Sequence, residues 1–289
     1  PSTMPNETHT EPTDAQTDAQ TDVQADVKYM KDSGEKRLIY IPSEAGQDNS
    51  KWAGRYEDRK VEIRDARNAD TAFELDTAGF AITPQTSAVG DFYDDAQITE
   101  IYEPEMVTLL QGLTGAARVH IFDHTRRADS KSMREEKVVR EPAGVIHNDY
   151  TKASAEKRIR DLFPEDEAND LLSRRFAIVN VWRPSNHAPI ETAPLALCDA
   201  RSVSVDDLIT VERHSKDRIG EVQQVIFNPD HQWFWYPRLQ ADEAILIKTY
   251  DSATDGRAQF SVHTAFEDPT APAGASPRES IETRAFVFF

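Results

Sequence analysis

The chain of 289 residues is predicted to be mainly β with a few flanking helices, an α+β protein whose strands form a cupin-like, two-sheet jelly roll. Three observations predict this class. Short apolar runs follow one another closely beyond residue 176, turn sequences such as Asn228-Pro229-Asp230 and Asp255-Gly256 separate them, and few segments show helical periodicity. A chain of this length can bury a sizeable core.

Residues 1–27 differ in composition from the rest and are predicted to be an acidic low-complexity arm. A tetrapeptide unit, Thr-Asp-Ala-Gln, begins at Thr13 and Thr17 and continues with substitutions at Thr21 and Ala25. On a helix, the aspartates would line one side beside a strip of Ala and Val too thin to hold the helix alone. We therefore expect a disordered or loosely docked arm; the alternative is a helix that binds a partner. Residues 28–289 are expected to form the globular domain.

The pattern from residue 28 onward predicts short strands and three helices. The first helix, 94–113, carries apolar residues such as Ile98, Met106 and Leu110 and stops at Thr114-Gly115. Pro164 separates a second helix, 153–163, from a third, 164–176, that begins with three acidic residues. The predicted strands are 37–42, 61–65, 79–83, 118–123, 177–182, 222–227, 232–236, 244–249, 259–263 and 281–289.

The bulk properties argue against several classes of protein. A formal net charge of −18 repels phosphate backbones, so nucleic acid is not an expected partner. No apolar stretch is long enough to cross a membrane, and the mean hydropathy is −0.63. The first residues lack the features of a signal peptide, and the single cysteine, Cys198, cannot form an internal disulfide. We therefore expect a cytoplasmic protein in which Cys198 is a small core residue.

The pattern with the most chemical content is His147-Asn148-Asp149, followed far downstream by His263. Residues i and i+2 of a strand point to the same side, so His147 and Asp149 can reach one ion, and His263 can supply a third ligand. Two imidazoles and one carboxylate can occupy one face of Fe(II) and leave the other open. Since about one such tripeptide is expected by chance, the alternative is that His147 is an ordinary hydrogen-bonded loop histidine.

Arg278 and Ser280 lie two residues apart beyond His263. They would offer a forked donor and a hydroxyl to a distal carboxylate, as an oxygenase that consumes 2-oxoglutarate requires.

Four other residues have two interpretations each. Trp235 can line an apolar substrate pocket or pack in the core. Arg126 and Arg127 can bind a carboxylate-bearing substrate or form a solvated basic turn. His124 can line the pocket or belong to a structural polar network.

Ten motifs in chain order carry a resemblance to a known family. They are Phe122-Asp-His-Thr-Arg-Arg127, Arg140-Glu-Pro142, His147-Asn-Asp-Tyr-Thr151, Arg160-Asp-Leu162, Asn180-Val-Trp-Arg-Pro184, Pro194-Leu-Ala-Leu-Cys-Asp-Ala-Arg-Ser202, Trp233-Phe-Trp-Tyr-Pro237, Lys248-Thr-Tyr-Asp-Ser252, His263-Thr-Ala-Phe266 and Pro277-Arg-Glu-Ser-Ile-Glu282. From residue 28 to the C-terminus, the chain resembles the hydroxylase/desaturase family that includes the gibberellin desaturase of fungi and a hydroxylase component of the cephamycin pathway.

The resemblance implies an Fe(II)- and 2-oxoglutarate-dependent oxygenase on a double-stranded β-helix. Such an enzyme uses O2 to hydroxylate or desaturate a secondary metabolite or amino-acid-derived molecule and releases succinate and CO2. The resemblance also implies that His147, Asp149 and His263 bind the iron. Arg278 would bind the distal carboxylate of 2-oxoglutarate with help from Ser280. The alternative anchor is Arg284, because both arginines can face the barrel interior from one strand.

Three further residues, Asn180, Arg183 and Tyr250, are expected around this site. The expected partner is a small-molecule substrate, and the assembly considered is a homodimer. The main alternative function is a non-catalytic jelly-roll module that binds a metabolite or a partner. A methyltransferase-associated subunit without iron is a third hypothesis, although the chain lacks a glycine-rich cofactor loop after a strand.

Overall fold

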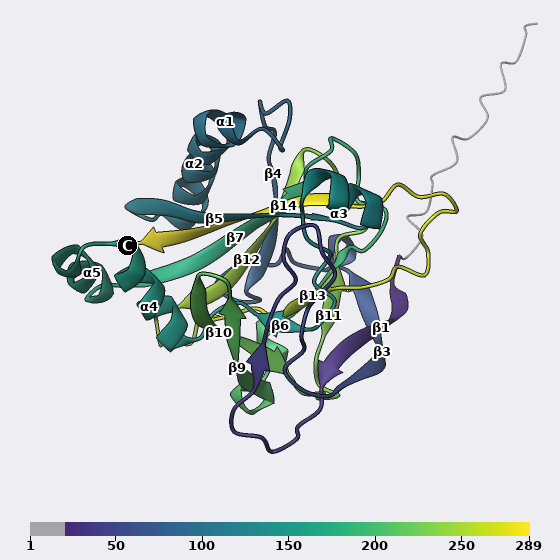
Figure 1. Cartoon of the computed structure of the whole chain (residues 1–289), viewed down its shortest axis with the longest axis horizontal. Coiled ribbons are helices and arrows are strands. Elements are labelled where there is room, and N and C mark those ends of the chain that lie inside the picture. Colours follow the sequence, from purple (N-terminus) through teal and green to yellow (C-terminus); the bar gives the residue numbers. More distant parts are fainter. Residues whose placement is uncertain (1–20) are drawn as a thin grey trace, which may run out of the picture.

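The computed structural model describes residues 21–289, which form two β-sheets with helices packed against one of them (Figure 1). Apolar side chains of both sheets meet in one buried cluster. Trp182 and Ile247 come from one sheet, and Leu197 and Phe234 come from the other. This face-to-face packing confirms the predicted mainly β jelly roll.

The smaller sheet has five strands among the described residues, in the order β4-β12-β7-β14-β5, and every neighbouring pair is antiparallel. Its outer face is covered by helix α2, whose Met106 and Leu110 pack against Val181 and Val287 of the sheet. Its inner face is therefore free to carry polar side chains toward the other sheet. The strand bounds are β4 Phe80–Pro84, β5 Arg118–Ala128, β7 Phe176–Pro184, β12 Glu243–Asp251 and β14 Glu279–Phe288.

The larger sheet has nine strands within residues 21–289, in the order β1-β3-β11-β8-β13-β6-β10-β9-β2. Two very short strands, β6 and β13, lie side by side at its centre. The strand bounds are β1 Val23–Met30, β2 Ile39–Tyr40, β3 Tyr56–Asp65, β6 His147–Asn148, β8 Leu195–Cys198, β9 Leu208–Ser215, β10 Arg218–Val225, β11 Trp233–Trp235 and β13 His263–Ala265.

The three predicted helices are present, with one subdivision. The predicted 94–113 helix consists of α1 (Asp95–Gln97), a π-helical segment (Ile98–Tyr102) and α2 (Glu103–Thr114). The side chain of Asp94 caps its start, and Gly115 ends it at a φ of 71°, a left-handed conformation that suits glycine. The other two are α4 (Lys152–Leu162) and α5 (Glu165–Leu172). A short helix, α3 (Lys131–Lys137), was not predicted.

The end of the tetrapeptide repeat is a strand, so the prediction of a loosely docked arm is wrong for residues 23–27. These residues begin β1, which pairs with β3 along its whole length. Val23, Ala25 and Val27 are buried, whereas Gln24 and Asp26 are exposed. Because four residues are two periods of a strand, the four-residue repeat also fits a strand. Ala25 places an apolar side chain between Val23 and Val27 on the same face. The predicted boundary after residue 27 thus falls within a strand, and residues 1–20 lie outside the described part of the chain.

Two further strand predictions need correction. Residues 259–262 of the predicted 259–263 strand are not part of a strand, and only His263 of that range belongs to β13. Strands β8 and β9 were not predicted. Cys198 ends β8 and is fully buried, which raises the pKa of its thiol to about 12 and agrees with a core role. None of the described helices is long and apolar enough to cross a membrane.

Candidate metal centre

The two short central strands place two histidines next to each other. In the antiparallel pair of β6 and β13, His147 lies directly opposite His263. Cross-strand neighbours have adjacent side chains, and the two imidazole ring centroids are 4.5 Å apart. Asp149 follows β6 immediately, two residues after His147. The pairing of these two strands thus brings together two histidines that are 116 residues apart in the sequence.

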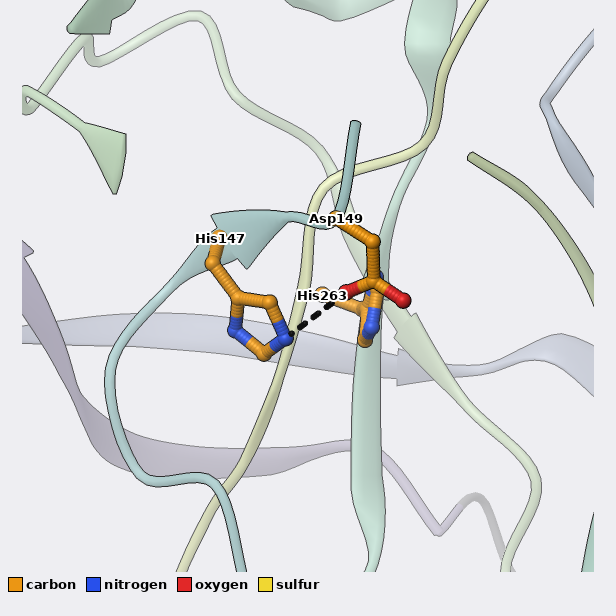
Figure 2. A group of neighbouring side chains, drawn as sticks. All are labelled: His147, Asp149 and His263. Atoms are coloured by element: carbon orange, nitrogen blue, oxygen red, sulfur yellow. Dashed lines mark ion pairs between the residues drawn. The ribbon is translucent and has the colours of Figure 1, made fainter. Parts of the chain in front are cut away.

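His147, Asp149 and His263 form a compact group of possible metal ligands (Figure 2). One ligand atom from each residue lies within 4.8 Å of the other two. His147 Nε2 lies 3.3 Å from Asp149 Oδ1. The structure therefore brings together the three residues that the sequence predicted. A single divalent ion between the three atoms would give the two-histidine, one-carboxylate arrangement typical of non-haem Fe(II) sites.

Both histidines have the same ring orientation relative to the main chain. His147 Nδ1 lies 2.7 Å from the carbonyl oxygen of Val145, and His263 Nδ1 lies 3.0 Å from that of Ser261. Because a carbonyl oxygen can only accept, Nδ1 is the protonated nitrogen of each ring, and Nε2 keeps a free lone pair. Burial and the nearby His147 also lower the pKa of His263, which favours the neutral form that binds metal.

Asp149 is held through one oxygen only. Its Oδ2 accepts hydrogen bonds from Asn180 Nδ2 at 2.8 Å and from Arg284 Nε at 2.9 Å. Its Oδ1 is the atom nearest His147. Burial acts to raise the pKa of Asp149, but contributions led by the charge of Arg284 outweigh it and hold that pKa well below its ordinary value. Asp149 is thus an anion whose Oδ2 is held by hydrogen bonds and whose Oδ1 is available to a metal ion. The prediction that Asn180 lies beside the metal ligands agrees with this geometry.

Arg284 connects the metal ligands to a polar network that the sequence analysis missed. It donates to Glu282 Oε2 at 2.8 Å and to Thr125 Oγ1 at 2.8 Å, and it forms an ion pair with Asp123 at 3.4 Å. The missed signal is the alternation in β14: Ser280, Glu282 and Arg284 share one face of a strand whose other face is apolar. Three polar residues at a spacing of two indicate a polar interior.

Arg278 has a different environment. It is 2% exposed, its Nε donates to Ser280 Oγ at 3.1 Å, and its guanidinium lies 5.0 Å from the ring centroid of Trp182. Another donor reaches the carbonyl oxygen of Ala193 at 2.5 Å. Within residues 21–289, Arg278 forms no ion pair with a carboxylate. Burial and the nearby Arg127 lower its pKa. A buried cation without an anion is a suitable position for the carboxylate of a small molecule.

A cavity of about 1230 Å³ reaches two of the candidate metal ligands, His147 and Asp149. His147, Asp149 and Arg284 line it, together with Arg127, which faces inward opposite Ser280. Arg127 also donates to the carbonyl oxygen of Glu141 at 2.7 Å. The cavity is large enough for a drug-sized organic molecule.

Three predicted site residues lie on the outer side of the five-stranded sheet instead. Arg183, His124 and Arg126 sit at the alternate positions of β7 and β5 and contact the covering helices and loops. Arg183 is therefore not beside the metal ligands. His124 belongs to a structural network, which was one of its two interpretations, and both His124 and Arg126 are also among the residues that line the cavity. Their hydrogen-bond partners are Gln85, Pro184 and Ala241 for Arg183, Thr283 and Glu103 for His124, and Phe92 and Asp95 for Arg126.

Two predicted aromatic residues are also away from the metal ligands. Trp235 is buried, packs edge-on against Phe266 and donates its indole N–H to the main chain of Thr21, so it is a core residue. Tyr250 packs against Phe176 and lines a separate cavity of about 760 Å³. A bulge in β12 before Tyr250 shifts the register there, which the sequence does not reveal.

Comparisons with known proteins show which family the chain resembles. Residues 27–288 match the oxidoreductase/YMDC permease-like domain family. The hydroxylase/desaturase CTB9 of Cercospora beticola is 34% identical over 272 residues, covering 84% of this chain and 83% of CTB9. The Fe(II)/2-oxoglutarate-dependent dioxygenase nvfI of Aspergillus novofumigatus is 33% identical over 267 residues, covering 89% of this chain and 93% of nvfI.

A solved structure is similar as well. The structure of the iron and alpha-ketoglutarate-dependent endoperoxidase NvfI superposes with a TM-score of 0.80 at 29% identity, covering 93% of this chain and 98% of that one. The relatives are thus matched over most of their length, and the fold is shared. The chain therefore belongs to the family of Fe(II)/2-oxoglutarate-dependent dioxygenases that contains these fungal hydroxylase/desaturases.

Proposed function

We propose that this oxygenase binds Fe(II) through His147, Asp149 and His263 and oxidises a small organic molecule. The observation that carries the proposal is that the protein holds each ligand side chain through one atom and leaves another atom available to the ion. In each histidine, Nδ1 is engaged by the main chain, and in Asp149 one oxygen is engaged by Asn180 and Arg284. The atoms left over in His147 and Asp149, Nε2 and Oδ1, lie 3.3 Å apart, and one ligand atom of His263 lies within 4.8 Å of a ligand atom of each. Such secondary contacts are what orients ligands in protein metal sites.

The co-substrate 2-oxoglutarate is proposed to bind with its distal carboxylate at Arg278. Arg284 is the alternative anchor, but its guanidinium is already engaged by Asp149, Glu282 and Asp123. Arg278 has a hydroxyl neighbour in Ser280 and no carboxylate partner among the described residues. Its deep position also protects the ion pair from water, which strengthens it.

The reaction proposed is hydroxylation or desaturation of a C–H-bearing substrate. Bound Fe(II) supplies the activation of O2: one oxygen atom enters succinate as CO2 leaves 2-oxoglutarate, and the other becomes the hydroxyl of the product or, in desaturation, water. The residues of the chain orient this chemistry. Asn180 and Arg284 fix the Asp149 carboxylate, Arg278 fixes 2-oxoglutarate, and the cavity holds the substrate near the open side of the ion.

Formation of a ternary complex tests this proposal. Anaerobic addition of Fe(II) and 2-oxoglutarate is expected to produce a weak visible charge-transfer band, and aerobic addition is expected to produce succinate. His147→Ala should abolish both. His120→Ala is a matched control, because His120 packs against Phe163 away from the ligands. Absence of the band in the folded wild-type protein, or its retention in His147→Ala, would contradict the ligand assignment.

The non-catalytic alternative has no observation in its favour, because all three ligand types are present and mutually arranged. The proposed setting is the cytoplasm, supported by the single buried cysteine. The net charge of −18 supports the absence of nucleic acid among the partners. A homodimer is retained as the proposed assembly, which size-exclusion chromatography with light scattering would test.

A further inference from the structure

The cavity above the metal ligands carries charge of the opposite sign to the whole protein. Eleven lysines and arginines line it against six aspartates and glutamates, whereas the chain has a net charge of −18. A cleft of one sign attracts ligands of the other and raises their local concentration. The excess of basic over acidic residues in the cavity therefore indicates an anionic ligand.

Six of these basic residues have no ion-pair partner among residues 21–289, and Arg127, Arg140 and Arg213 are three of them. Of the three, only Arg127 makes a side-chain hydrogen bond, to a carbonyl oxygen. All three are half-buried. By comparison, the half-buried Arg175 is paired with the carboxylate of Asp251 through two hydrogen bonds.

The main chain brings these arginines to one part of the cavity. An isolated parallel bridge joins Arg127 to Arg140. Arg213 lies opposite Gly220 on the neighbouring strand β10, so no side chain covers it from there. Burial, Arg284 and Arg140 lower the pKa of Arg213 to about 10, which means that positive groups surround it. The grouping costs stability by like-charge repulsion, and a bound anion would relieve it.

The co-substrate does not account for Arg213. The two carboxylates of 2-oxoglutarate are assigned to the metal and to Arg278. The charged neighbours of Arg278 are Arg127, Asp129 and Glu282, and Arg213 is not among them. Arg213 belongs instead to the part of the cavity formed by Arg140 and the β9–β10 pair.

The same part of the cavity exposes apolar side chains. Trp52 is 47% exposed and stacks on Tyr40 with ring centroids 5.3 Å apart. Val138 is 63% exposed at a φ of 54°, a strained conformation for a β-branched residue, and Ile219 is 55% exposed. All four residues line the cavity. Large exposed apolar side chains gathered at a cavity indicate a contact surface for an apolar ligand.

We propose that the substrate of this enzyme is an amphipathic organic carboxylate, whose carboxylate binds Arg213 and Arg140 and whose apolar body contacts Tyr40, Trp52 and the rim residues Val138 and Ile219. The proposal rests on the proposed function, since it assigns the 2-oxoglutarate carboxylates to other groups.

A matched pair of probes tests the proposal: naphthalene-2-carboxylate and its neutral carboxamide, titrated calorimetrically under argon into protein saturated with Fe(II) and 2-oxoglutarate. The saturating 2-oxoglutarate occupies the proposed carboxylate site at Arg278 before the probe is added. The carboxylate is expected to bind about 10-fold more tightly than the carboxamide, as one charge-assisted contact provides. Equal binding of the two probes, or binding of neither, would overturn the proposal.

Substitution of Arg213 tests whether this residue is responsible for the preference for the carboxylate probe. Arg213→Gln should remove the preference for the carboxylate and leave carboxamide binding unchanged, whereas Arg213→Lys should keep part of the preference. Arg201→Gln is the charge-matched control, because Arg201 is exposed and pairs with Asp199 outside the cavity. Since Arg213 has no carboxylate partner in the described chain, Arg213→Gln should not lower the midpoint of thermal unfolding.

The outcomes separate this inference from the proposed function. Absence of the Fe(II)–2-oxoglutarate band contradicts the proposed function, and the preference for the carboxylate can still be compared between wild type and Arg213→Gln, because Arg278 is the same in both proteins. If Arg213→Gln weakens 2-oxoglutarate binding as much as it weakens carboxylate binding, Arg213 serves the co-substrate and the substrate assignment is wrong.

Discussion

Arg278 and Arg284 lie six residues apart in the same segment of the chain, yet their surroundings are opposite. Arg284 is within 3.4 Å of carboxylates from Asp123, Asp149 and Glu282. Arg278 has no carboxylate within ion-pair distance in residues 21–289, and it rests on Trp182. The segment therefore presents a fully paired cation at the metal end and an unpaired cation at the other end.

The difference shows how to separate a positioning residue from a ligand-binding residue of the same type. Burial acts to lower the pKa of both arginines. At Arg284 the three carboxylates outweigh it and raise the pKa, whereas at Arg278 the nearby Arg127 adds to the lowering. A guanidinium whose charge is compensated by the protein holds structure together. One whose charge is not compensated is ready for an external anion.

The largest effect is expected at the metal end. Asp149→Ala removes the only anionic ligand and should reduce succinate formation by more than about 100-fold, since changes in residues that merely orient ligands already cost 10–100-fold. Succinate is measured by chromatography in the presence of saturating Fe(II). Activity within 10-fold of wild type would remove Asp149 from the ligand set.

Arg284→Gln should mainly affect stability. It leaves Asp149 and Glu282 buried without their cation, so the free energy of unfolding is expected to fall by about 3 kcal/mol, measured by urea denaturation of the metal-free protein. The matched variant Arg278→Gln removes a cation with no carboxylate partner and should leave stability unchanged or raised. Equal losses in both variants would break the comparison between the two arginines.

Arg278→Gln should affect the co-substrate instead. The KM for 2-oxoglutarate is expected to rise about 30-fold, because the lost contact is a buried charge-assisted pair worth about 2 kcal/mol. Iron binding should be unaffected. An unchanged KM would place the anchor elsewhere, and Arg284 would be the next residue to test.

Asn180→Ala tests the second contact to Asp149 Oδ2. Loss of this amide leaves the carboxylate held by Arg284 alone, and Fe(II) affinity is expected to fall about 10-fold. Isothermal titration with Fe(II) under argon measures the change. A wild-type affinity would mean that Arg284 alone positions Asp149.

Ser280→Ala should give the smallest effect. The hydroxyl accepts from Arg278 Nε and adds one hydrogen bond near the proposed carboxylate, so the KM for 2-oxoglutarate should rise about 3-fold. Initial rates over a range of 2-oxoglutarate concentrations measure it. A rise as large as that of Arg278→Gln would make Ser280 an equal partner in co-substrate binding.

Local patterns predicted the mainly β class and the three clustered ligand residues. The spacing of His147 and Asp149 is a local property of β6 and the residue that follows it, so sequence sufficed there. Placement of Arg183 and Tyr250 depends on which face of a strand is interior, and a β7 strand buried on both faces gives no alternation from which to read it. The strand at Val23–Met30 was missed because its repeat of four fits a helix as well as a strand.

Both histidines that are proposed to bind the metal have their Nδ1 proton held by a carbonyl oxygen two residues earlier in the chain, at Val145 and Ser261. No side chain takes part in that contact. Replacing residues elsewhere in the cavity wall therefore leaves the imidazole tautomers unchanged. Enzymes built in this way can acquire new substrates in evolution by altering the surrounding side chains, while the chemistry at the ion is inherited intact.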